Sequence, residues 1–75
     1  MIKTTEIPME HNCSRFTFDV IIKFCGYELS CRFVDKQEAE KINDIAELLV
    51  KFDWIKAQKN LECITEKIWT LKKVY

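Results

Sequence analysis

The sequence predicts an α+β fold in which an antiparallel β-hairpin, which a third N-terminal strand can extend, packs on two C-terminal helices. Two runs of residues alternate between apolar and polar side chains around a single glycine, which is typical of paired strands. Farther along the chain, apolar residues recur at helical spacing. The 75 residues include one glycine and one proline, so few positions favour loops, and this length corresponds to a single small globular domain.

The N-terminal residues are the least regular part of the chain. Residues 2–7 are predicted to form a short strand, and Pro8 suits the edge or the end of it because proline cannot donate a backbone hydrogen bond. Residues 10–14, EHNCS, are predicted to connect this strand to the hairpin.

The hairpin is predicted from the clean alternation in residues 16–24 and 27–33. With Cys25-Gly26 as a two-residue turn, the residue numbers of each cross-strand pair sum to 51. On the outward face this pairs Lys23 with Glu28 and Asp19 with Arg32, and both pairs are opposite in charge. A four-residue loop would lose those charge pairs, so the tight turn is preferred, although cysteine is an unusual residue for positive φ. The turn pairs these residues on the other face: Phe24 with Tyr27, Ile22 with Leu29, Val20 with Cys31, and Phe18 with Phe33.

Two helices are predicted after the hairpin. Asp35 can cap the first helix, and Glu38 can reach back in the manner of a capping box. The stripe of the first helix contains Ala39, Ile42, Ile45, Ala46, Leu49 and Phe52. A second stripe contains Trp54, Ala57, Leu61, Ile64, Ile68, Leu71 and Tyr75. At about 100° per residue the second stripe is rotated by roughly 80° from the first, so we expect a bend near Phe52-Asp53, with Asp53 as the next cap.

The last residues of the chain allow an alternative. Residues 63–75, CITEKIWTLKKVY, are rich in residue types that favour strands, so this segment could form an additional strand beside the hairpin. The unbroken spacing of the second stripe favours the helix, which is the preferred interpretation.

The charges of the chain balance at twelve acidic and twelve basic residues. No overall excess of Lys and Arg therefore indicates binding to a phosphate backbone or to anionic lipid. The N-terminal residues lack the apolar stretch of a signal peptide, and no apolar run approaches the length needed to span a bilayer. We therefore expect an intracellular, cytoplasmic protein in which the cysteines are free thiols: Cys13, Cys25, Cys31 and Cys63.

No arrangement of residues predicts an enzyme, a metal site or a cofactor. Structural zinc sites use closely spaced ligand pairs, whereas the cysteines and His11 follow no such spacing. Cys25 precedes Arg32 without the glycines that would present backbone amides to a phosphate. We therefore expect a non-enzymatic protein with no cofactor.

Several large apolar residues lie off the predicted core stripes. Trp69 lies about 120° from the centre of its stripe and Ile55 about 160°, while Leu48 and Val50 flank the first stripe. Tryptophan is the residue most enriched at the energetic centres of protein interfaces. The alternative is that Trp69 widens the core stripe, because a helix between a sheet and another helix needs a broad apolar arc.

These features favour a small protein-binding module that acts sterically by occupying a surface of another protein. Trp69 with Ile55 or Leu48 is the expected anchor, and lysines of the last helix, including Lys73, are expected at the rim. In size, balanced charge and lack of a catalytic constellation, the chain is similar to small viral or phage accessory proteins that inhibit host or defence proteins.

The alternative function is a homodimeric nucleic-acid-binding regulator or antitoxin. One strand segment followed by two helices is also the order of elements in ribbon-helix-helix repressors, but here Asp19 lies on the outward face of the strand. A weak basic surface is expected on the last helix, from Lys56, Lys59, Lys67, Lys72 and Lys73. The dimer interface would contain Leu61, Ile64, Ile68 and Leu71. Nucleic acid is the less favoured partner because Glu62 and Glu66 dilute these lysines.

Overall fold

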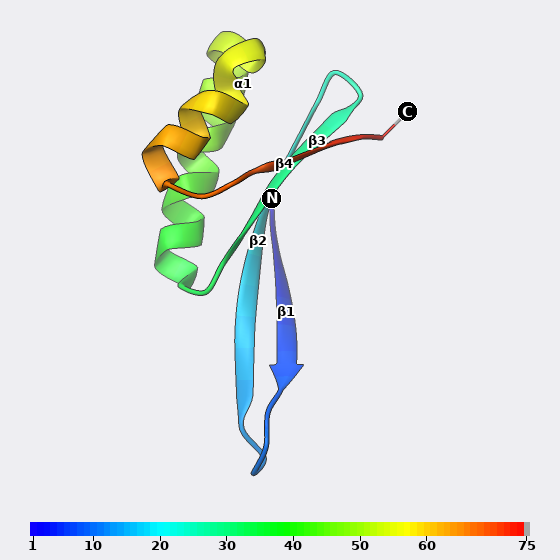
Figure 1. The fold of residues 1–75 in the computed structure, drawn as a ribbon, viewed down its shortest axis with the longest axis vertical. Coiled ribbons are helices and arrows are strands. Elements are labelled where there is room, and N and C mark those ends of the chain that lie inside the picture. Colours follow the sequence, from blue (N-terminus) through cyan, green and yellow to red (C-terminus); the bar gives the residue numbers. More distant parts are fainter. Residues whose placement is uncertain (75) are drawn as a thin grey trace.

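The protein is a four-stranded antiparallel sheet with one helical element on one of its faces (Figure 1). The computed structural model describes residues 1–74. The elements follow the chain as β1 (Ile2–Pro8), β2 (Ser14–Phe24), β3 (Tyr27–Phe33), α1 (Lys36–Thr65) and β4 (Thr70–Lys73). The strands lie side by side in the order β1-β2-β3-β4, which confirms the predicted α+β class.

The hairpin formed by β2 and β3 has the predicted register. Asp19 lies opposite Arg32, and the Arg32 Nε donates a hydrogen bond to Asp19 Oδ1 at 2.9 Å. Cys25 and Gly26 form the turn with φ angles of 47° and 78°. Positive φ at both central residues is the mark of a type I′ turn, whose twist matches that of the flanking strands. The tight turn is therefore confirmed.

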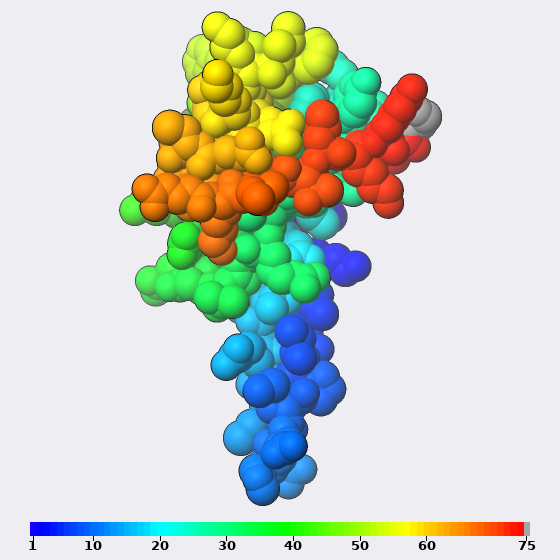
Figure 2. Space-filling view, in the orientation of Figure 1, coloured from blue at the N-terminus to red at the C-terminus, as the bar shows by residue number. Residues whose placement is uncertain are grey.

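The third N-terminal strand is confirmed as β1. It pairs with β2 from Ile2 opposite Val20 to Pro8 opposite Ser14. Pairing with β3 reaches only to Phe18, so beyond that residue β1 and β2 continue as a two-stranded arm. The arm projects beyond the N-terminal end of α1 and forms the narrow end of the molecule (Figures 1 and 2).

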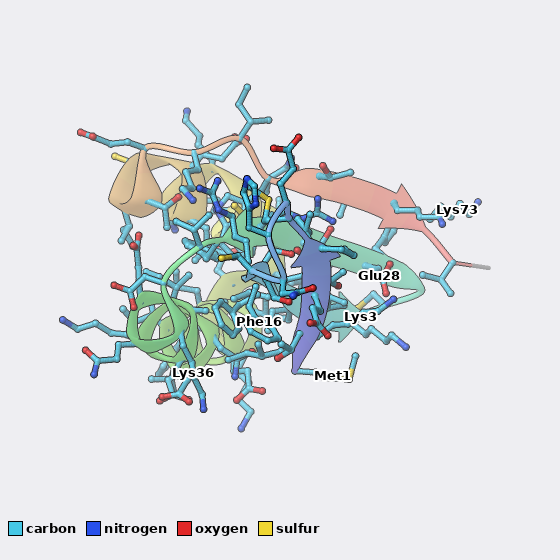
Figure 3. All side chains as sticks on the ribbon, turned by 90° about the horizontal axis from the view of Figure 1, so that it is seen from below. Met1, Lys3, Phe16, Glu28, Lys36 and Lys73 are labelled. Atoms are coloured by element: carbon cyan, nitrogen blue, oxygen red, sulfur yellow. The ribbon has the colours of Figure 1, made fainter. Side chains whose placement is uncertain are left out.

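The expectation of two separate C-terminal helices is wrong, because one helical element, α1, contains all the helical residues among residues 1–74. The predicted bend lies inside it, at Asp53, which has φ −156° and ψ 88°. The Asp53 Oδ1 accepts hydrogen bonds from the backbone N–H groups of Ile55 at 3.2 Å and Lys56 at 3.3 Å. The ribbon reverses there, so the parts before and after Asp53 lie side by side on one face of the sheet (Figures 1 and 3).

The expectation that helix continues through residues 66–74 is also wrong. The helix ends at Thr65, and Glu66 takes up a left-handed conformation with φ 55°. The chain then crosses to β3, where Thr70 pairs opposite Ser30 at the start of β4. The alternative of an additional strand is therefore confirmed for Thr70–Lys73, while residues 63–65 are helical. Tyr75, the last member of the predicted stripe, lies outside the described residues.

The physical reason for this outcome is tertiary. Without β4, the polar backbone of β3 would have no partner strand on that side, and a pairing segment removes this deficit. Strand pairing of a segment rich in β-forming residues then outweighs its helical spacing.

The core lies between the inner face of the sheet and the two parts of α1. Alanines at three of the buried helix positions let the helix backbone approach the sheet closely. The core side chains are Val20, Ile22, Leu29, Cys31 and Phe33 from the sheet, and Ala39, Ile42, Ala46, Leu61 and Trp69 from the rest of the chain. The outer face of the sheet has no helix over it (Figure 3).

Candidate functional site

The most exposed large apolar side chains of α1 gather around its bend. Phe52 is 86% exposed and Ile55 is 73% exposed, and they lie on either side of Asp53. Leu48, at 56% exposure, lies one turn before Phe52 on the same side of the helix. We call these three residues, Leu48, Phe52 and Ile55, the bend surface. The helical reversal that carries them forms the end of the molecule opposite the arm (Figure 2).

Two local features hold the bend in place. The Asp53 carboxylate caps the second part of α1 through the hydrogen bonds described above. Trp54 packs against Phe24, with ring centroids 6.2 Å apart, and Phe24 in turn lies 6.5 Å from Tyr27. These contacts tie the bend to the turn between β2 and β3, so the bend surface is presented by an anchored segment.

Charged side chains border the bend surface. Lys51 and Lys56 are exposed next to Phe52 and Ile55, and Glu47 is exposed next to Leu48. Isolated exposed apolar residues are normal, but three together with a charged rim are typical of an association surface.

The structure brings together only part of the predicted protein-binding set. Leu48 and Ile55 are exposed at the bend, as expected. Lys73 lies in β4 and not on a helix, opposite Tyr27 near the end of the strand (Figure 3). The exposure of Phe52 is not predicted from the sequence, because its spacing places this residue in the first core stripe. Its position immediately before the predicted Asp53 cap was the available signal, since the last residue before a reversal loses its core partners.

The expectation of an exposed Trp69 is wrong. Trp69 belongs to the core, as the alternative expected, but it lies in the connection between α1 and β4 and so does not widen a helical stripe. Trp69 is 1% exposed, and its ring meets that of Phe33 edge-on at 6.2 Å. Its backbone N–H donates to Glu62 Oε2 at 3.0 Å, and its indole Nε1 donates to Thr65 Oγ1 at 3.1 Å. Its carbonyl accepts from Gln58 Nε2 at 2.9 Å. The side chain is therefore unavailable to a partner in the folded protein.

The four residues predicted for a dimer interface do not form one helical stripe. Leu61 is fully buried in α1, while Ile64 is half exposed near its end. Ile68 lies in the connection after the helix and Leu71 lies in β4. The reason is the helix end at Thr65, which separates the last two residues from the first two.

The four cysteines differ in exposure. Cys13, Cys25 and Cys63 are exposed free thiols, whereas Cys31 is buried in the core. Burial raises the pKa of the Cys31 thiol above its ordinary value of 9.0, while the nearby Lys67 ammonium acts in the opposite direction. Within residues 1–74, no three His, Cys, Asp or Glu side chains gather in a way that could hold a metal ion. The helical segment that is described is too polar to cross a membrane.

Two of the open depressions on the described surface lie between or beside elements that carry charged residues. One, of about 450 Å³, lies between β2 at Ile21–Lys23, the N-terminal Met1 and the α1 residues Glu47 and Lys51. The other, of about 440 Å³, lies at the outer edge of β3 and is lined by Asp19, Ser30, Arg32 and Lys67 among others. Neither lining pairs a nucleophile with a histidine.

Comparison with models of protein families, with curated proteins and with solved structures finds no match for this chain.

Proposed function

We propose that this protein is a non-enzymatic binding protein that acts by occupying a surface of another protein. The observation that carries this proposal is the exposure of Phe52 and Ile55 at the anchored bend of α1. Fully burying a side chain of this size contributes about 1.5–3 kcal/mol, so these residues would give a partner a substantial apolar contact.

The geometry favours insertion of the bend into a groove. The bend is convex and stands at one end of the molecule (Figure 2). Because Asp53 and Trp54 hold it to the rest of the fold, little conformational entropy is lost when it binds. The rim residues Lys51, Lys56 and Glu47 would set orientation and association rate more than affinity.

The mechanism we propose is steric inhibition, in which the bend fills a site that another molecule would use. The exposed thiols of Cys13, Cys25 and Cys63 suit a reducing, intracellular setting, where free cysteines persist. A small inhibitor of a host or defence protein, of the kind that viruses and phages encode, fits this description.

The experiment is an affinity pull-down from lysate of the native or host cell, with nuclease added and mass spectrometry as the readout. Wild type is compared with the double variant Phe52→Ser/Ile55→Ser. The matched control is Val34→Ser/Ile68→Ser, which removes two apolar side chains of similar exposure, 70% and 88%, away from the bend. All three proteins are checked for unchanged circular dichroism.

We expect one protein to be recovered near stoichiometrically by wild type and by the control, and at least about tenfold less by the bend variant. Equal recovery of that protein by the bend variant would show that the bend surface is not the binding site.

A further inference from the structure

The outer face of the sheet carries charge in rows that run across the strands. The register places Lys3, Asp19 and Arg32 in one row. A second row contains Lys23, Glu28 and Lys72, and the hydroxyls of Ser30 and Thr70 lie between the two rows. Lys3 and Glu28 can be seen on the side of the sheet away from α1 (Figure 3). We call this surface, with Arg15 in the arm, the outer face.

The fold separates charges that balance along the chain. The outer face has five basic and two acidic residues, a net charge of +3, in a chain whose twelve acids and twelve bases sum to zero. Residues 35–53, the cap and first part of α1 on the other side of the sheet, have six acidic and three basic residues, a net charge of −3. The outer face and the first part of α1 therefore have net charges of opposite sign.

The acids of the outer face are recessed between the bases. The Asp19 side chain is 20% exposed and the Arg32 side chain 63% exposed, and two hydrogen bonds of 2.9 and 3.4 Å join them. Glu28 is half-buried, whereas Lys23 and Lys72 on either side of it are exposed. An approaching ligand therefore meets lysine and arginine groups before it meets a carboxylate.

The depression at the outer edge of β3 adds to this surface. Its lining includes Arg32, Lys67, Ser30 and Thr70, which supply two cations and two hydroxyls, beside the recessed Asp19 carboxylate and the side chains of Cys31 and Ile68. The Lys67 ammonium is held in place, since it donates to the Arg32 carbonyl at 3.0 Å and lies 4.3 Å from the centre of the Phe33 ring. Guanidinium, ammonium and hydroxyl groups are the side-chain donors that contact phosphate oxygens.

We propose that the outer face binds the phosphate backbone of nucleic acid. A protein partner would need a central large side chain to bury, but within residues 1–74 the two charge rows contain no aromatic and no large apolar residue. The exposed apolar side chains near them, Met1, Ile7 and Ile68, lie at the margins of the surface. Backbone phosphates need no such anchor. Without aromatic residues on which bases could stack, binding is independent of sequence.

This surface differs from the basic surface expected from the sequence. That expectation placed five lysines on the last helix, whereas Lys72 and Lys73 lie in β4 and Lys67 lies in the connection before it. The strand pairing replaces that helical surface by a sheet surface, to which Lys3 and Lys23 come from the other end of the chain.

The test is fluorescence anisotropy of a labelled 20-nucleotide single strand of mixed sequence, and of the corresponding duplex, with salt raised from 50 to 200 mM. Because the whole protein is neutral, general attraction to a polyanion is absent, and binding must come from the segregated charge. About three phosphate contacts predict that affinity falls about 20- to 40-fold over this range.

The decisive variant is Lys3→Glu/Lys23→Glu/Lys72→Glu. Its matched control is Lys36→Glu/Lys41→Glu/Lys51→Glu, which changes the net charge equally on exposed lysines of α1. We expect the first variant to lose at least about tenfold in affinity at 50 mM salt and the control to lose less than about threefold. The Phe52→Ser/Ile55→Ser variant should bind the oligonucleotide as wild type does, so this result is independent of the bend surface.

Three results would overturn the proposal. The first is no binding at 50 mM salt, and the second is an equal loss of affinity in the two lysine variants. The third is displacement of the oligonucleotide by polyglutamate when the concentration of glutamate residues equals that of the phosphates. The last result would assign the outer face to an acidic protein instead.

Discussion

Trp69 and Phe52 show how differently two large aromatic residues are placed by the same fold. Each lies close to the end of a helical part, and each follows a stretch with helical spacing. Yet Trp69 is 1% exposed and Phe52 is 86% exposed. Local sequence does not distinguish them, so the course of the backbone after each helical part decides their exposure.

The two segments are held by different interactions. After Thr65 the chain turns back over β3, which carries Trp69 between Phe33 and the second part of α1. Hydrogen bonds from and to Glu62, Thr65 and Gln58 satisfy its polar groups there. At the bend, the Asp53 cap reverses the chain at the end of the sheet, and Phe52 is left without core neighbours. Burial of Trp69 therefore depends on hydrogen-bond partners for its polar groups, whereas the exposed Phe52 needs no such partners.

The largest effect that tests this comparison is expected for Trp69→Ala. Removing a buried tryptophan side chain destabilises a protein by about 3–5 kcal/mol, which is comparable with the whole stability of a domain of this size. We expect the variant to be largely unfolded at 25 °C by circular dichroism and urea titration.

The matched control is Phe52→Ala, for which the free energy of unfolding should change by less than about 0.5 kcal/mol. Trp69→Phe serves as an intermediate, because it keeps a ring in the core but loses the bond to Thr65 Oγ1, at a cost of about 1 kcal/mol plus the loss of packing. Equal stability of Trp69→Ala and Phe52→Ala would contradict the burial of Trp69.

A smaller effect is expected for Asp53→Ala, which tests whether the Asp53 side chain stabilises the bend. Loss of the cap should lower the free energy of unfolding by about 0.5–2 kcal/mol, because two backbone N–H groups lose their acceptor. Asp35→Ala, at the start of α1, removes a cap of the same kind and should have an effect of similar size.

Urea titration of both variants measures these changes. If only Asp35→Ala is destabilised, the reversal at Asp53 does not depend on its side chain, and the bend surface would not be anchored in the way described.

The smallest effect concerns Cys31, the one buried thiol within residues 1–74. Its pKa is raised above 9.0 because burial disfavours the thiolate. The stability that the protonated thiol contributes is therefore fully present below about pH 9 and is lost as pH rises through the raised pKa. Between pH 8 and 10.5, the Tm of wild type should fall more than that of Cys31→Ala.

Thiol labelling gives a second readout for the same residue. At pH 8 a disulfide reagent should react quickly with Cys13, Cys25 and Cys63, and with Cys31 only on unfolding. Four equally fast thiols in the folded protein would show that the core is open at Cys31.

Interactions between near neighbours could be predicted from the sequence. The register of β2 and β3 follows from alternation and from the charge pair of Asp19 with Arg32, because a tight turn leaves few other ways to pair the strands. The helix start at Asp35 and the bend at Asp53 follow from side chains that accept hydrogen bonds two and three residues onward. Leu48 and Ile55 could be identified as exposed because their angles on the helix depart from the core stripe.

Three features were decided only by the tertiary structure. The spacing of the apolar residues in 70–73 fits a helix, whereas their composition fits a strand. These residues form a strand because β3, about forty residues earlier in the chain, offers an edge with which they can pair. The burial of Trp69 follows from that crossing. The charge of the outer face arises because pairing places Lys3, Lys23, Arg32 and Lys72 on one surface, although they are spread along the whole sequence. Period and capping act over a few residues and are visible in the sequence, whereas surface charge and burial depend on which distant segments become neighbours.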